Sequence, residues 1–246
     1  MVVRERGAER SSRIFTLTEL RNLRRLASYP QIGVIRFGFL LLLRTVSSMT
    51  SQALLIWRTD RQSRLDKLFS AHYTLGGKGR GRRWTTEQIN WALVLLLAAE
   101  FQGFARDLHD EAGDFFVRQA AEGNVVLESV IKRQIRHGRK LDHGNAQPAS
   151  LGADFELLGL LLWAALKIRC PNMAKKWHKN LVRLNETRNA LAHSHAVAIR
   201  NLMVNLDIIR SWRKSMDGLA RKMDDVVAEY LRGLFGEIDP WNLERS

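Results

Sequence analysis

One apolar stripe near the C-terminal end constrains the fold more than any other feature of the sequence. Apolar residues recur there every three or four positions, which is the repeat of one face of an α-helix. Gly233 and Gly236 follow and are predicted to end this helix. The pattern favours a long helix in a helical bundle. The stripe comprises Ile199, Leu202, Leu206, Ile209, Trp212, Met216, Leu219, Met223, Val226 and Tyr230.

Shorter periodic segments predict further helices upstream. Thr85 or Thr86 can cap one of them, with Glu87 and Gln88 in its first turn. The segment at 155–168 is apolar on nearly every face, so we expect it to be central. The glycine-rich or polar stretches 75–84 and 138–155 are predicted as loops. No segment indicates a strand, and the predicted fold is an all-α bundle. The predicted helices are 51–72, 85 to about 122, 124–137, 155–168 and 171–193.

Residues 1–48 differ in composition from the rest of the chain. They hold nine arginines and three glutamates but no lysine, aspartate or tryptophan. Met49 is therefore a candidate for the true start, with 1–48 as an upstream extension. The alternative is that 1–48 form a genuine basic arm. In either case, residues 49–246 are predicted to form one helical domain.

The charge and the single cysteine limit the classes of protein to consider. A net charge of +14 predicts an anionic partner, with nucleic acid first and an acidic membrane surface second. The apolar runs at 37–43 and 91–99 are far shorter than the roughly 20 residues that span a bilayer. Cys170 alone excludes an intramolecular disulfide and a four-cysteine zinc site, and it fits a reduced, cytoplasmic setting.

The stretch LNETRNALAH, residues 184–193, carries the residues with the clearest chemistry. Arg188 offers a planar, permanently charged fork for phosphate oxygens, and His193 can exchange a proton near neutral pH. Such a pair can cleave an RNA phosphodiester without a metal, and Asn189 can orient either partner. Residues five apart point about 140° apart on a straight helix, so the two can share a site only where the helix ends or bends near Ala192. The alternative is an exposed arginine and a histidine at a helix end.

RNALAH matches the R-x4–6-H motif of the HEPN superfamily, including the favoured asparagine after the arginine. The stretch RLDKLFSAHYTLGGKGRGRRWTTEQINWALVLLLAAEFQGFARDLHDEA also resembles the opening of bacterial RiboL-PSP-type HEPN proteins, and the likeness covers about 60–235. It implies a metal-independent endoribonuclease, often a toxin or defence factor, with Arg188 and His193 catalytic and Asn189 supporting. In that family the motifs of two protomers usually share a cleft. A toxin branch carries an adenylylated tyrosine where this chain has His195, so that modification is not expected here.

Three other features complete the site prediction. Glu100 lies in an apolar run without a local cation, and we expect it either to pair with Arg188 or to lie at the helix surface. A basic loop can hold an RNA backbone, or it can be a flexible solvated loop; its charged residues are Lys78, Arg80, Arg82 and Arg83. His193 and His195 lack nearby cysteines or paired carboxylates, so we expect neither a metal nor a cofactor.

The sequence is compatible with three functions. The first is an endoribonuclease that leaves 2′,3′-cyclic phosphate ends and acts as a homodimer. The sequence favours the dimer because 155–168 and the long stripe offer more apolar face than a small bundle needs; in the alternative, these faces close a monomeric core. The second is a non-catalytic HEPN-like module that binds RNA or a nucleotide, or serves as a scaffold. The third is a membrane-surface protein. An antitoxin or a nucleotidyltransferase as partner is left open.

Overall fold

The computed structural model describes residues 50–76, 84–193, 204–236 and 238–242, which all belong to one packing unit, Ser47–Ser246. Within these ranges the chain is helical and contains no strand, which confirms the predicted all-α fold. The extension predicted at 1–48 lies outside the described residues. The elements are α2 (Gln52–Ile56), the π-helical turn η2 (Trp57–Arg61), α3 (Gln62–Gly76), α4 (Trp84–Ala121), α5 (Val125–Arg136), α6 (Lys140–His143), α7 (Pro148–Glu156), α8 (Leu162–Arg169), α9 (Pro171–Ala192) and α11 (Leu206–Phe235).

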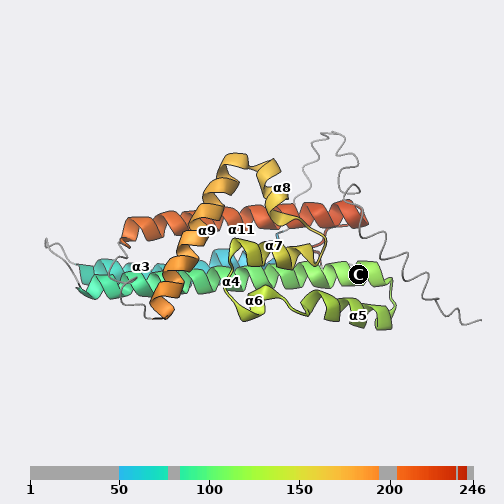
Figure 1. Cartoon of the computed structure of the whole chain (residues 1–246), viewed down its shortest axis with the longest axis horizontal. Coiled ribbons are helices and arrows are strands. Elements are labelled where there is room, and N and C mark those ends of the chain that lie inside the picture. Colours follow the sequence, from blue (N-terminus) through green and yellow to red (C-terminus); the bar gives the residue numbers. More distant parts are fainter. Residues whose placement is uncertain (1–49, 77–83, 194–203, 237, 243–246) are drawn as a thin grey trace, which may run out of the picture. The chain divides into compact units, whose positions relative to one another are not determined.

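The longest helix, α4, has 38 residues and lies at the centre of this unit. Helices α3 and α11 both pack along it, and α9 crosses it (Figure 1). Its fully buried apolar side chains recur at the helical repeat and therefore form one broad face that the neighbouring helices cover. These side chains are Leu93, Val94, Leu97, Phe101, Phe104, Ala105, Leu108 and Ala112. The predicted helix from 85 to about 122 is confirmed as one unbroken element, but the predicted cap is wrong, because the helix begins at Trp84 and Thr85 and Thr86 lie within its first turn.

Two carboxylates from other helices fix the start of the first helix. Asp224 of α11 accepts hydrogen bonds from the backbone N–H and the hydroxyl of Ser51, the residue that caps α2. Glu111 of α4 accepts the next two backbone N–H groups, at 2.9 and 2.5 Å. Burial raises the pKa of Glu111 to about 7 and that of Asp224 to about 6. From this anchor α2, η2 and α3 follow one another to Gly76, which confirms the helix predicted at 51–72.

The loop predicted at 138–155 is wrong, because this stretch contains α6 and nearly all of α7. Pro148 occupies the first turn of α7, where a proline costs no hydrogen bond. The buried carboxylate of Asp154 accepts the backbone N–H groups of Lys140 and Leu141 at 2.7 and 2.8 Å, and so holds the start of α6. Short helices of this kind are stabilised by tertiary contacts rather than by a local sequence pattern.

The single helix predicted at 155–168 is also wrong. The chain turns between α7 and α8, and Gly159 adopts a φ of 82°, a left-handed conformation that glycine reaches without a steric penalty. The Tyr230 hydroxyl donates to the carbonyl of Leu158 at 2.8 Å and holds this turn against α11. Several apolar side chains of the segment are buried, namely Phe155, Leu158, Leu160, Leu162 and Leu166. Leu157 and Leu161 nonetheless stay exposed beside the turn.

Helix α11 confirms the predicted apolar stripe from Leu206 onward, whereas 194–203 lie outside the described residues. Asn205 caps its start by accepting the N–H of Ile208 at 2.9 Å, and Gly236 ends it with a φ of 90°. Gly233 lies inside the helix. The stripe is buried within one chain, so this face offers no spare surface for a second copy. Its buried members are Ile209, Trp212, Met216, Leu219, Met223 and Val226.

Candidate functional site

The motif arginine lies on the packed side of α9, near the end of that helix. Arg188 follows the fully buried Leu181 and Leu184 by seven and four residues, which places it on the same helical face, and it is half-buried. Its Nη1 donates to Oδ1 of Asn189 at 3.2 Å. The same oxygen accepts from Nδ2 of Asn145 at 2.5 Å. Asn189 therefore links the guanidinium to the turn that precedes α7.

The turn that carries Asn145 is held firmly between α4 and α9. Gln102 of α4 donates to the carbonyls of Leu141 and Gly144 at 2.9 and 2.7 Å. Buried Asn185 of α9 donates to the carbonyl of Ala146 at 3.1 Å. These side-chain amides bind turn carbonyls that accept no hydrogen bond within a helix. The turn that contacts Asn189 is therefore held in one position. The sequence did not single out Asn145, because its partner lies 44 positions away.

His193 lies where α9 ends. The helix stops at Ala192, and His193 has φ −97° and ψ 8° while its backbone N–H donates to the carbonyl of Asn189 at 3.0 Å. Its side chain is exposed. Arg188 and His193 can share a site only if the helix ends or bends near Ala192, and the helix does end there. An exposed imidazole at a helix end is accessible to a substrate, and the Arg188 guanidinium, five residues earlier, is hydrogen-bonded to the side-chain amide of Asn189. His195 lies outside the described residues.

Glu100 does not lie at the surface, and its partners are Arg61 and Arg64 rather than the predicted Arg188. Arg61 donates from Nη1 at 2.8 Å, and Arg64 donates from Nε and Nη2 at 2.5 and 2.7 Å. Burial alone would raise the pKa of Glu100, but the hydrogen bonds from Arg64 and Arg61 outweigh it and lower the pKa. Gly103 makes room for this cluster, because an added Cβ would lie 2.4 Å from Arg61 Nη1. The cluster joins α3 and η2 to α4.

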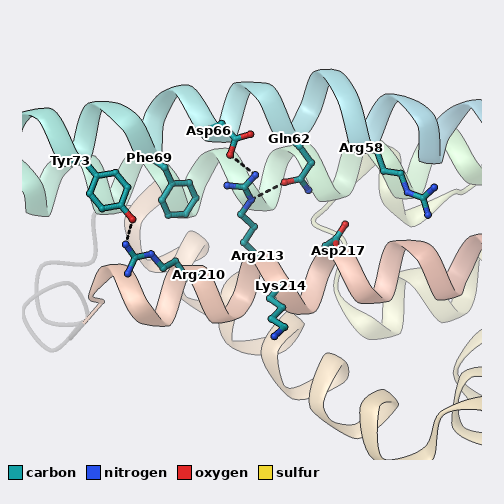
Figure 2. Close-up of a pocket in the computed structure, with 9 residues that line it drawn as sticks. All are labelled: Arg58, Gln62, Asp66, Phe69, Tyr73, Arg210, Arg213, Lys214 and Asp217. Atoms are coloured by element: carbon teal, nitrogen blue, oxygen red, sulfur yellow. Dashed lines mark hydrogen bonds and ion pairs between the residues drawn. The ribbon is translucent and has the colours of Figure 1, made fainter.

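A second polar feature is a groove between α3 and α11 with a volume of about 600 Å³. Figure 2 shows that its lining side chains come from η2 and α3 on one side and from α11 on the other. None of Glu100, Arg188, Asn189 and His193 lines it. None of its nine lining residues was predicted from the sequence to belong to a site. They are Arg58, Gln62, Asp66, Phe69, Tyr73, Arg210, Arg213, Lys214 and Asp217.

Comparisons with protein families, with curated proteins and with solved structures return no match. In the described part of the chain, no three His, Cys, Asp or Glu side chains gather where they could hold a metal ion. Likewise, none of the helices described is long and apolar enough to cross a membrane. The basic loop predicted to bind RNA, with Lys78, Arg80, Arg82 and Arg83, lies outside the described residues.

Proposed function

We propose that this chain is a metal-independent endoribonuclease, a toxin or defence protein of the HEPN type, that cleaves RNA with Arg188 and His193. One observation carries the proposal. The motif helix ends directly before an exposed His193, while Asn189 and Asn145 hold Arg188 one turn earlier. A charged fork with a fixed position and an accessible proton-transfer group are what metal-free phosphodiester cleavage needs. A non-catalytic RNA-binding module is the alternative.

In the proposed reaction the 2′-oxygen of a ribose attacks the adjacent phosphorus, and the bond from phosphorus to the 5′-oxygen breaks. The proton of the 2′-hydroxyl passes to a general base, and the leaving 5′-oxygen takes a proton from a general acid. His193 fills one of these roles. Arg188 stabilises the negative charge that grows on the phosphoryl oxygens in the transition state. The products are a 2′,3′-cyclic phosphate and a 5′-hydroxyl.

The nature of the product ends tests this chemistry. We expect the purified chain to cleave total RNA in the presence of EDTA, because neither proposed group needs a metal. The 3′ ends should resist alkaline phosphatase until mild acid opens the cyclic phosphate, and the 5′ ends should accept phosphate from a polynucleotide kinase. A protein that binds RNA but leaves it intact, with or without magnesium, would support the non-catalytic module instead.

The proposal includes a symmetric homodimer whose two motifs meet in one cleft. Two copies supply two histidines and two arginines to one scissile phosphate, enough for an acid, a base and charge stabilisation, and an isologous pair is the commonest oligomer. Sedimentation at micromolar concentration should therefore show a dimer. Arg188→Ala and His193→Ala chains should regain part of the activity when refolded together, if each cleft takes its arginine and its histidine from different protomers. A fully active monomer would contradict the shared cleft.

A further inference from the structure

The groove between α3 and α11 is crossed at two places by bonded side chains. Both helices pack on α4, and side chains bridge the space between them. Arg213 of α11 donates from Nε to Gln62 Oε1 at 2.8 Å and bonds Asp66 at 2.7 Å. Arg210 donates to the Tyr73 hydroxyl at the end nearer Gly76 (Figure 2). The lining on the α3 side runs from Arg58 to Tyr73, about 22 Å at 1.5 Å per residue.

The charge of this groove is positive and only partly compensated. Its lining holds four cationic side chains and two carboxylates. Arg213 is paired with Asp66, whose side chain is 64% exposed, and an ion pair exposed to this degree is weak enough to be exchanged for a ligand phosphate. Within the described ranges, Arg58 and Lys214 are exposed and form neither a hydrogen bond nor an ion pair, although the charge of Arg58 counteracts the rise in the pKa of buried Asp224. Arg210 is likewise paired, with Asp207 at 2.7 Å, and the side chain of Asp207 is also exposed. The groove thus holds two cations in weak, exposed ion pairs and two cations without an ion pair, Arg58 and Lys214.

Aromatic rings accompany these cations. The Arg213 guanidinium lies 5.1 Å from the centre of the Phe69 ring, and the Arg210 guanidinium lies 5.4 Å from that of Tyr73. Phe69 is buried beneath its arginine, whereas the Tyr73 side chain is exposed. Aromatic rings and guanidinium planes are the surfaces on which unpaired bases stack. Because Phe69 is covered, the flat surfaces open to bases are the exposed Tyr73 ring and the guanidinium planes of the arginines. With the positive charge for phosphates, they supply the two elements of a single-strand binding channel.

We infer that the α3–α11 groove binds a short segment of single-stranded nucleic acid, at a site separate from the Arg188–His193 motif. The cations are spread along the groove, which suits a chain of phosphates better than one nucleotide. Flat surfaces inside a groove between two helices suit unpaired bases, because bases within a duplex are already stacked. A membrane surface would need apolar side chains that project outward, whereas Phe69 is buried. The inference does not depend on the proposed cleavage, since a strand can bind here whether or not it is cut.

Binding of a fluorescein-labelled oligouridine of about twelve nucleotides tests this groove. The full-length chain carries His193→Ala and is kept in EDTA, and anisotropy is measured over a range of salt concentrations. Arg58→Gln with Lys214→Gln removes the two free cations of the groove. Lys176→Gln with Lys179→Gln removes the same charge from exposed positions on α9 outside the groove. Circular dichroism and thermal melting establish that both doubly substituted proteins fold.

We expect the groove double variant to bind the oligouridine roughly 10- to 30-fold more weakly near 0.1 M salt. A plot of log K against log salt should also become shallower by about 1.4, which corresponds to two lost phosphate contacts. The α9 control should keep an affinity within about threefold of the parent. Equal losses in both variants would mean that net charge alone drives binding, and unchanged binding in both would exclude the groove; either result overturns the inference. Binding of both double variants to phosphatidylserine vesicles is measured in parallel. If the groove double variant lost binding to the vesicles but not to the oligouridine, the inference would also be overturned.

Discussion

Replacement of Arg188 by alanine should lower the rate of RNA cleavage in EDTA by about 10²- to 10³-fold, because one charged donor to the transition state is lost. The cause is chemical rather than structural, since Arg188 is half-buried and its hydrogen bond runs to its neighbour Asn189. Arg188→Lys should recover only part of the rate, because an ammonium group keeps the charge but loses the planar fork. Single-turnover kinetics on a defined RNA measure this directly.

Asn145→Ala is the matched test of how Arg188 is positioned. It leaves the guanidinium in place but removes the amide that donates to Asn189. We expect a loss of about tenfold, which corresponds to roughly 1.4 kcal/mol and is typical of one hydrogen bond. Asn145→Asp should not restore the rate, because a carboxylate has no N–H to donate to the amide oxygen of Asn189. If Asn145→Ala cleaved RNA at the wild-type rate, the contact between Asn145 and Asn189 would have no part in positioning Arg188.

Glu100→Gln should destabilise the fold by about 3 kcal/mol, because it leaves the mostly buried Arg61 without one of its carboxylates. The amide keeps the size of the side chain, so the effect isolates the lost charge. Asp107 still bonds Arg61 at 2.7 Å and limits the loss. Urea unfolding followed by circular dichroism gives the change in the free energy of unfolding.

Asp114→Asn on the same helix provides the control for this change. Asp114 pairs with Lys132 and Arg136, and all three side chains are at least 39% exposed. Such exposed pairs contribute little, so its change should stay below about 1 kcal/mol. Glu100→Gln should cleave RNA at close to the parent rate well below its unfolding temperature. If Glu100→Gln strongly lowered the rate of cleavage without lowering the free energy of unfolding, Glu100 would have a role in catalysis.

The sequence predicted those parts of the fold that repeat locally. The stripe through Trp212 and Met216 and the start of α9 at Pro171 were predictable because spacing and proline geometry act within a few residues. By contrast, α6 depends on Asp154, which accepts its first N–H groups from 13 and 14 positions away. Composition alone made this stretch look like a loop. The break at Gly159 likewise depends on a contact with Tyr230 in another helix.

The candidate site divides in the same way. The motif residues Arg188 and His193 could be named from the sequence, whereas the partners of Glu100 lie 36 and 39 positions earlier and had no local signal. One side of the groove shows a recognisable spacing in the sequence. Five of its residues on η2 and α3 recur every three or four positions from Arg58 to Tyr73, which marks one helical face. That face could be recognised as a site only when α11 was placed opposite it.

His193 carries the central claim, and one measurement tests it most directly. A defined, end-labelled RNA is incubated in EDTA with the wild-type chain and, in parallel, with His193→Ala and His193→Gln chains of equal thermal stability. His193 is exposed at the end of α9, so these substitutions should not disturb the core. The account predicts cleavage to cyclic phosphate ends by the wild type and a loss of about 10²- to 10⁴-fold in both variants. Cleavage by His193→Ala at the wild-type rate, or none by the wild type, would contradict it.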